Sequence, residues 1–166
     1  MGQYHLLVNL DKREFVDPHK LGNGFKLYEQ IGSEYGIPQA MHVLLCACPE
    51  SRGGGDYCAD ANEAAVGILG RWVGDRVVIV GDYAEKTDHP RLGVDLSAAY
   101  RACRENEDDA GSVTPPSYTD ISGEVRTVLG KLLGIVYDAK DAGGWVSVSK
   151  DPAARYSIIE ERAAGG

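Results

Sequence analysis

The densest strand pattern in the chain is the run Val77–Val80, in which four β-branched apolar residues follow one another. A run that is apolar on both faces is typical of a strand covered on both sides, so we expect it to be central and buried. Glycine–aspartate pairs bracket the run at Gly74-Asp75 and Gly81-Asp82, and such pairs indicate turns. The first pair also predicts a hairpin that joins this strand to the segment around Trp72.

Three further segments have strand patterns. Residues 4–10 carry apolar side chains at alternate positions, and residues 14–16 follow a polar turn as the return strand of a hairpin. Residues 145–149 alternate in the same way near the other end of the chain. Together with the strand near 77–82, these segments predict a small sheet.

Helical periodicity is clearest over residues 120–137, where apolar residues recur at steps of three and four and Thr119 or Asp120 is suited to cap the start. Residues 24–35 show an amphipathic pattern after Asn23, a plausible N-cap, and residues 95–104 predict a further helix. Residues 39–48 are apolar nearly all round, which favours a buried helix and leaves a strand as the alternative.

These patterns predict an α+β fold in one domain that spans residues 1–166, with a mainly antiparallel sheet covered by helices. Strands are expected near 4–10, 14–16, 77–82 and 145–149, and helices near 24–35, 39–48, 95–104 and 120–137. The polar stretch 106–116 predicts a mobile loop, and residues 163–166 are expected to fray.

The charge balance narrows the classes of partner. The net charge of −8 is unfavourable for general nucleic-acid binding, which needs clustered Lys and Arg, but it leaves room for a small anionic ligand held by local donors. The N-terminal sequence lacks the pattern of a signal peptide, and the longest apolar run, Val43–Cys48, is too short to span a bilayer. We therefore expect a cytoplasmic protein with reduced thiols and no membrane partner.

Four phrases of the sequence resemble a known family: MGQYHLLVNLDKREF and PHKLG near the start, then GRWVGDR and VGDYAE around the opening strand. They are similar to small uncharacterised proteins of bacteriophages and GC-rich prokaryotes. The resemblance covers most of the first 90 residues. It implies a viral or mobile-element origin and adds host-directed binding proteins to the functions considered, and it carries over no activity and no catalytic residue.

A glycine-rich loop, Arg52–Asp56, is the most suggestive candidate for ligand binding, because glycines let backbone N–H groups approach an anion closely. No Walker lysine follows it, so a simple connector remains the favoured interpretation. Turn chemistry explains Asp75 and Asp82. Arg71, beside Trp72, could stack on a base or cover the edge of the core, and the second is the commoner arrangement. If the chain has a ligand site, we expect it to be lined by His19, Lys20, Arg52, Gly54, Asp56, Arg71 and Asp82.

Four metal-ligand residue types, His42, Cys46, Cys48 and Cys58, lie close together in sequence. Their cysteine pair has one intervening residue and sits in an apolar run, whereas zinc sites space such pairs by two to four residues on a turn. Core packing is the favoured role for these cysteines, and we expect no metal and no cofactor.

No catalytic constellation is recognisable. The sequence therefore favours a non-catalytic binding or accessory protein that acts through protein–protein contacts or self-assembly. Two alternatives stay open: a binder of a phosphate-bearing or nucleotide-like small molecule, and a hydrolase that uses carboxylates such as Asp56 and Asp82, with or without a metal.

Overall fold

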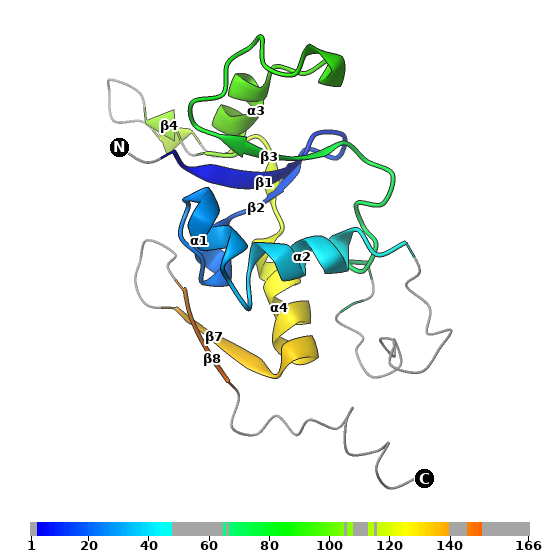
Figure 1. The fold of residues 1–166 in the computed structure, drawn as a ribbon, viewed down its shortest axis with the longest axis vertical. Helices are drawn as coiled ribbons and strands as arrows, with labels where there is room; N and C mark the ends of the chain where they lie inside the picture. Colours follow the sequence, from blue (N-terminus) through cyan, green and yellow to red (C-terminus); the bar gives the residue numbers. More distant parts are fainter. Residues whose placement is uncertain are drawn as a thin grey trace, which may run out of the picture.

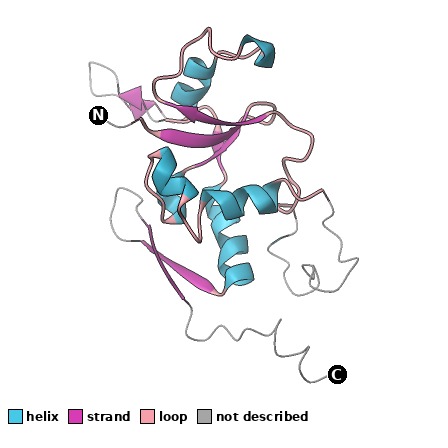
Figure 2. Cartoon of the chain, in the orientation of Figure 1, coloured by secondary structure: helices cyan, strands magenta, loops and turns pink. Residues whose placement is uncertain are grey.

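The α+β class predicted from the sequence is confirmed by the computed structural model, which describes residues 3–47, 65, 67–104, 106–107, 113–114, 116–139 and 146–150 (Figure 2). The helices in this part of the chain are α1 (Leu27–Ile31), α2 (Ile37–Leu44), α3 (Leu96–Ala102), α4 (Ser122–Leu133) and the short 3₁₀ turns η1 (Pro18–Leu21) and η4 (Pro90–Leu92). The strands are β1 (His5–Asn9), β2 (Glu14–Val16), β3 (Val77–Gly81), β4 (Asn106–Glu107), β5 (Val113–Thr114), β6 (Thr119–Asp120), β7 (Ile135–Ala139) and β8 (Val146–Lys150).

The main sheet has the strand order β3-β1-β2-β6. β1 pairs antiparallel with both β2 and β3, and only the two-residue β6 runs parallel to its neighbour β2. The hairpin expected between β3 and the segment around Trp72 is wrong, because β3 instead pairs with β1, with Leu7 opposite Ile79. Residues 67–74 form turns that bring the chain to the start of β3.

Both faces of the sheet carry a hydrophobic core. Helices lie on either side of the sheet (Figure 1). Leu7 and Val16 point to the side covered by α2 and α4, whereas Leu6, Val8 and Phe15 point to the side covered by α3. β1 is consequently buried along almost its whole length, and it occupies the central position that the sequence suggested for Val77–Val80.

The prediction that Val77–Val80 is a buried central run is wrong in part. β3 is a strand, as expected, but it lies at one edge of the sheet. Val80 is buried, Val77 and Val78 are half-buried, and the side chain of Ile79 is 39% exposed. The run is apolar on both faces because both cores extend to this edge, not because another strand lies beyond it among the described residues.

The helices follow the predicted periodicity with shorter bounds. The apolar stripe of α4 is buried as expected, but the helix ends at Gly134, whose positive φ of 59° suits glycine. Val136, which continues the helical spacing in the sequence, belongs instead to β7, and it pairs with Ser149 of β8. The alternative left open for residues 39–48 is decided for a helix by α2.

Asn23 does not cap α1 as predicted. It is buried, and its Oδ1 accepts a hydrogen bond from the N–H of Ile37 at 2.9 Å, so it holds the start of α2. Lys26 is the residue that precedes α1. Most of residues 106–116, predicted to be a mobile loop, and all of residues 163–166 lie outside the described residues. In the described part of the chain, no helix has the length and apolar character needed to cross a bilayer.

Candidate functional site

Two predicted site residues, His19 and Lys20, lie on η1, where the chain leaves β2. The Nζ of Lys20 is 2.5 Å from Oδ2 of Asp120, which follows from the pairing of β6 beside β2. The other oxygen of Asp120 accepts hydrogen bonds from both the hydroxyl and the N–H of Ser122, at 2.5 and 2.9 Å. The positive charge of Lys20 is therefore matched within the fold.

Asp17 completes this group, which we call the η1 cluster (Asp17, His19, Lys20, Asp120 and Ser122). Its N–H donates to Ser122 Oγ at 2.8 Å, and its carboxylate accepts from the N–H of His19 at 2.9 Å. Burial raises the pKa of Asp17 above its ordinary value, and the hydrogen bond from His19 opposes this effect only in part. These bonds tie the end of β2 to β6 and to the start of α4.

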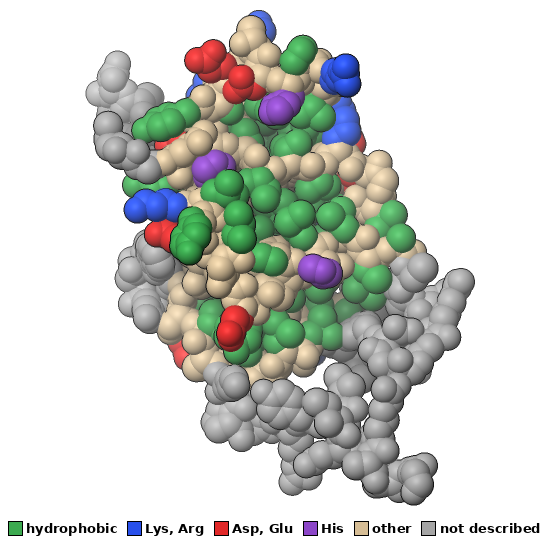
Figure 3. Space-filling model, in the orientation of Figure 1, with side chains coloured by type: hydrophobic (Ala, Val, Ile, Leu, Met, Phe, Trp, Pro, Cys, Tyr) green, Lys and Arg blue, Asp and Glu red, His purple; other side chains and the backbone are tan. Residues whose placement is uncertain are grey.

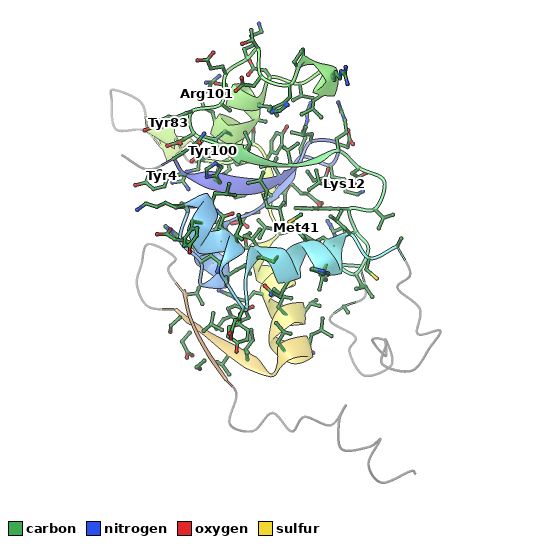
Figure 4. The ribbon with its side chains drawn as sticks, in the orientation of Figure 1. Tyr4, Lys12, Met41, Tyr83, Tyr100 and Arg101 are labelled. Carbon is green, nitrogen blue, oxygen red and sulfur yellow. The ribbon has the colours of Figure 1, made fainter. Side chains whose placement is uncertain are left out.

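The ring of His19 stacks on Phe25, with 3.6 Å between the ring centroids. Phe25 also meets the edge of Tyr4, and the guanidinium of Arg104 lies 5.0 Å above its ring centroid. The N–H of Tyr4 donates to Oδ1 of Asp82 at 3.0 Å. His19 and Asp82 therefore flank one row of aromatic side chains, and Tyr4, Tyr83 and Tyr100 gather at this end of the sheet (Figure 4).

Arg71 belongs to a different part of the molecule. It makes a two-pronged ion pair with Glu14 of β2, through Nε at 2.9 Å and Nη2 at 2.6 Å. The indole N–H of the fully buried Trp72 donates to the same carboxylate at 2.8 Å. The hydrogen bonds from Arg71 lower the pKa of Glu14, so this buried carboxylate is held in its charged form. The guanidinium of Arg71 is thus engaged in pairing with Glu14 at the edge of the core.

The remaining predicted site residues, Arg52, Gly54 and Asp56, lie outside the described residues. Whether they approach His19 or Asp82 stays a prediction. Asp75, which flanks β3, accepts hydrogen bonds from Lys12 and from the buried Asn9, at 2.5 and 2.8 Å. This carboxylate fastens the β1–β2 turn to the start of β3.

The thiols that the structure describes have unequal surroundings. Cys103 is buried, its Sγ donates to the carbonyl of Ala99, and burial raises its pKa to about 12, which disfavours the reactive thiolate. Cys46 is half-buried just after α2, and Cys48 and Cys58 lie outside the described residues. Over the described ranges, no three His, Cys, Asp or Glu side chains are grouped so that they could hold a metal ion.

The outer edge of β3 offers backbone groups for hydrogen bonding. The backbone N–H of Leu10 donates to the carbonyl of Arg76, and the backbone N–H of Asp82 donates to the carbonyl of Tyr4. The even-numbered residues from Arg76 to Asp82 therefore point their backbone groups at β1. The N–H groups of Val77, Ile79 and Gly81 must then point away from the sheet. No other strand of the described residues pairs with this side of β3.

Helix α1 has an inverted distribution of polar and apolar residues. Gln30 is its buried residue, at 1% exposure, and its amide donates to the carbonyls of His5 and Phe25 at 3.0 Å. Leu27, Tyr28 and Ile31 are instead 40%, 87% and 67% exposed. A helix that presents its apolar residues to solvent is unfavourable unless something covers them, so α1 adds a candidate contact surface.

Strand β3 and the helices α1 and α2 can be followed together in Figure 1. In the orientation of Figure 1, β3 is the nearest strand and α1 and α2 lie below it. The space-filling view shows apolar side chains gathered on this face, over β3 and between β3 and α2 (Figure 3). Met41 lies between α2 and the sheet (Figure 4), where it packs against the core. We call the outer side of β3 (Val77–Gly81), with the 39% exposed Ile79 at its centre, the β3 edge surface.

Comparison with known proteins adds no relative: no protein-family model, curated protein or solved structure matches the chain. The resemblance to small bacteriophage proteins stays a prediction.

Sequence reasoning missed the β3 edge surface because apolar residues were assigned to the core. The exposed apolar side of α1 was missed as well. The helical pattern places Leu27, Tyr28 and Ile31 on one face, which was expected to be buried, but the helix has only five residues. Its single buried residue is the polar Gln30, whose burial is tolerated because its amide donates hydrogen bonds to two backbone carbonyls. The sequence alone does not show which face of so short a helix meets the sheet.

Proposed function

We propose that this is a non-catalytic binding protein that acts through protein–protein contacts, with the β3 edge surface as its docking site. The observation that carries the proposal is the outer edge of β3: an apolar strand of five residues with outward backbone groups and a 39% exposed Ile79 at its centre. Such an edge is a ready template for a further strand from another chain.

The charged residues of the predicted site and of the β3 turns support the same proposal, because their charges are already paired within the fold. Lys20, Arg71 and Asp75 each have a charged partner inside the fold, at 2.5–2.6 Å. Groups that hold the fold together in this way have little capacity left for a substrate. At the β3 edge, the outward N–H groups have no partner strand among the described residues and Ile79 is 39% exposed, and addition of a strand would pair with the first and cover the second.

The proposal includes a cytoplasmic setting and the predicted phage or mobile-element origin. Both come from the sequence, and both suit a small protein whose work is to bind another protein.

The test is selection of a displayed library of random peptides on the full chain, immobilised at low density. We expect enriched peptides with alternating apolar residues, whose binding is lost in Ile79→Lys because the added charge blocks pairing at the edge. The matched control is Thr119→Lys, which puts the same charge on the exposed Thr119 of β6, at the opposite edge of the sheet.

Peptides that bind the wild type and Thr119→Lys but not Ile79→Lys would support the proposal. Peptides that bind all three proteins equally would show docking elsewhere and overturn it. Circular dichroism of each variant confirms that its fold is intact before binding is compared.

A further inference from the structure

The sequence of β3 is complementary to itself when two copies run antiparallel. An isologous pair of strands is related by a two-fold axis, so each residue on one side of the axis meets its counterpart on the other. The outward backbone groups belong to Val77, Ile79 and Gly81, and at Gly81 the carbonyl already accepts from the N–H of Ala84 at 3.0 Å, which leaves its N–H for a partner. Only registers that pair these three residues with one another can form the ladder.

One register pairs all three. With the axis at Ile79, Ile79 faces Ile79 of the second copy, and Val77 faces Gly81 of the second copy. The side chain of Gln3 fills the space that a Cβ at Gly81 would take, so Val77 of the second copy would lie beside Gln3, and Val78 meets Val80 on the other face of the sheet. Shifting the register by one ladder step in either direction leaves one of the outward residues without a partner.

The same register also places opposite charges across from each other at the two ends of the strand. Arg76 and Asp82 are equally far from Ile79, so each lies opposite the other residue of the second copy. Arg76 already binds Asp11 through its guanidinium, and Asp82 accepts from Tyr4 through one carboxylate oxygen, so their ends of β3 are fixed in place. Opposite charges across neighbouring strands favour pairing, and like charges oppose it.

We propose that the occupant of the β3 edge surface is a second copy of this chain, paired antiparallel through β3 about a two-fold axis at Ile79. The inference rests on the proposed function, since it names the partner of the same surface. The two four-stranded sheets then join into one continuous sheet of eight strands, and the apolar face seen in Figure 3 is turned toward the partner.

Sedimentation velocity of the full chain over a concentration series tests whether a dimer forms, and a disulfide tests its register. Ile79→Cys places two thiols in directly opposed residues, whose Cα atoms are about 5.5 Å apart in such a pair. That spacing lies within the range that a disulfide spans. Val77→Cys is the matched control, because its two copies would lie about 13 Å apart along the strands.

We expect a concentration-dependent dimer and, under mild oxidation, a 79–79 disulfide identified by mass spectrometry of the digested protein. Asp82→Lys sets like charges opposite Arg76 at both ends, and we expect it to weaken the dimer by roughly tenfold. A chain that stays monomeric to about 1 mM, or a dimer that crosslinks at 77 as readily as at 79, overturns the inference.

The two proposals fail separately. A monomer that still selects peptides at the β3 edge leaves the proposed function standing and removes the second copy as partner. A chain that neither dimerises nor selects peptides dependent on Ile79 removes both.

Discussion

The two edges of the main sheet differ in nearly every respect. At the β6 edge the strand has two residues, and Asp120 is engaged by Lys20 and Ser122. At the β3 edge the strand has five residues, four of them β-branched, and no strand in the described part of the chain pairs with its outer side. Charged residues thus close one edge, and apolar residues leave the other open.

The contrast between the two edges indicates which part of this chain is available to bind a partner. His19, Lys20 and Arg71 attract attention in the sequence because charged and aromatic side chains often build sites. In the fold, Lys20 and Arg71 satisfy buried or half-buried carboxylates. The apolar strand, which looks like core, is the part with unused bonding capacity. Four variants test this contrast.

The largest effect is expected from Arg71→Met. It leaves the carboxylate of Glu14 buried without its cation, and we expect the free energy of unfolding to fall by about 3 kcal/mol, the lower end for a buried pair because Arg71 is itself 35% exposed. Urea unfolding measures the loss. Arg76→Met removes an exposed ion pair with Asp11 as the control, and it should cost far less. Equal losses would contradict a special role for Glu14 in the core.

Ser122→Ala should be the next most harmful. Ser122 is fully buried, and its hydroxyl accepts from the N–H of Asp17 and donates to Asp120, so the substitution leaves the part-buried N–H of Asp17 without this acceptor. We expect a loss of about 1–3 kcal/mol in the free energy of unfolding. Ser97→Ala, which removes only an exposed contact with Arg101, is the matched control. A neutral Ser122→Ala would mean that the η1 cluster does not hold this edge.

Asp17→Asn tests the electrostatics of the same edge. Because the pKa of Asp17 is raised by burial, the folded state holds this proton more tightly than the unfolded state does, and stability from this group is lost as the pH rises through the raised pKa. Asparagine keeps an oxygen for the N–H of His19 but has no such loss. In urea unfolding at a series of pH values, the free energy of unfolding of the variant should rise relative to that of the wild type as the pH increases above 3.8, the ordinary pKa of an aspartate. A difference in the free energy of unfolding that stays constant with pH would contradict a raised pKa for Asp17.

The smallest effect on stability is expected from Ile79→Lys. Its side chain is 39% exposed at the open edge, so the free energy of unfolding should change by about 1 kcal/mol or less. Binding at the edge should nevertheless be abolished. A loss as large as that of Arg71→Met would show that Ile79 serves the core, and the contrast between the edges would fail.

The parts of the fold that the sequence predicted are those set by local periodicity. The apolar stripe of α4 repeats over twelve residues, and the alternation near β1 and β8 is short but clear. Gly134 is the signal that could have ended the helix before Val136, because glycine suits the left-handed residue that closes a helix.

The parts that were missed depend on contacts between distant segments. The pairing of Arg71 with Glu14, and of Lys20 with Asp120, joins residues that no local pattern relates. The position of Val77–Gly81 at an edge depends on β1 taking the centre of the sheet, although the sequence of β3 (VVIVG) is more apolar than that of β1 (HLLVN). Among the predicted site residues that the structure describes, His19 and Lys20 lie together on η1, and Asp82 is linked to His19 through Tyr4 and Phe25.

The pairing of β1 with β3 also has a consequence for the order of folding. β1 and β2 are joined by a short turn and can meet early, whereas β3 begins only at Val77, after a long stretch of intervening chain. Non-local pairing of this kind is slow, so until it forms the edge of β1 is itself unprotected. During synthesis, the β3 strand of one nascent chain could then complete the sheet of another, and a molecule that exchanges strands would arise from the same two segments.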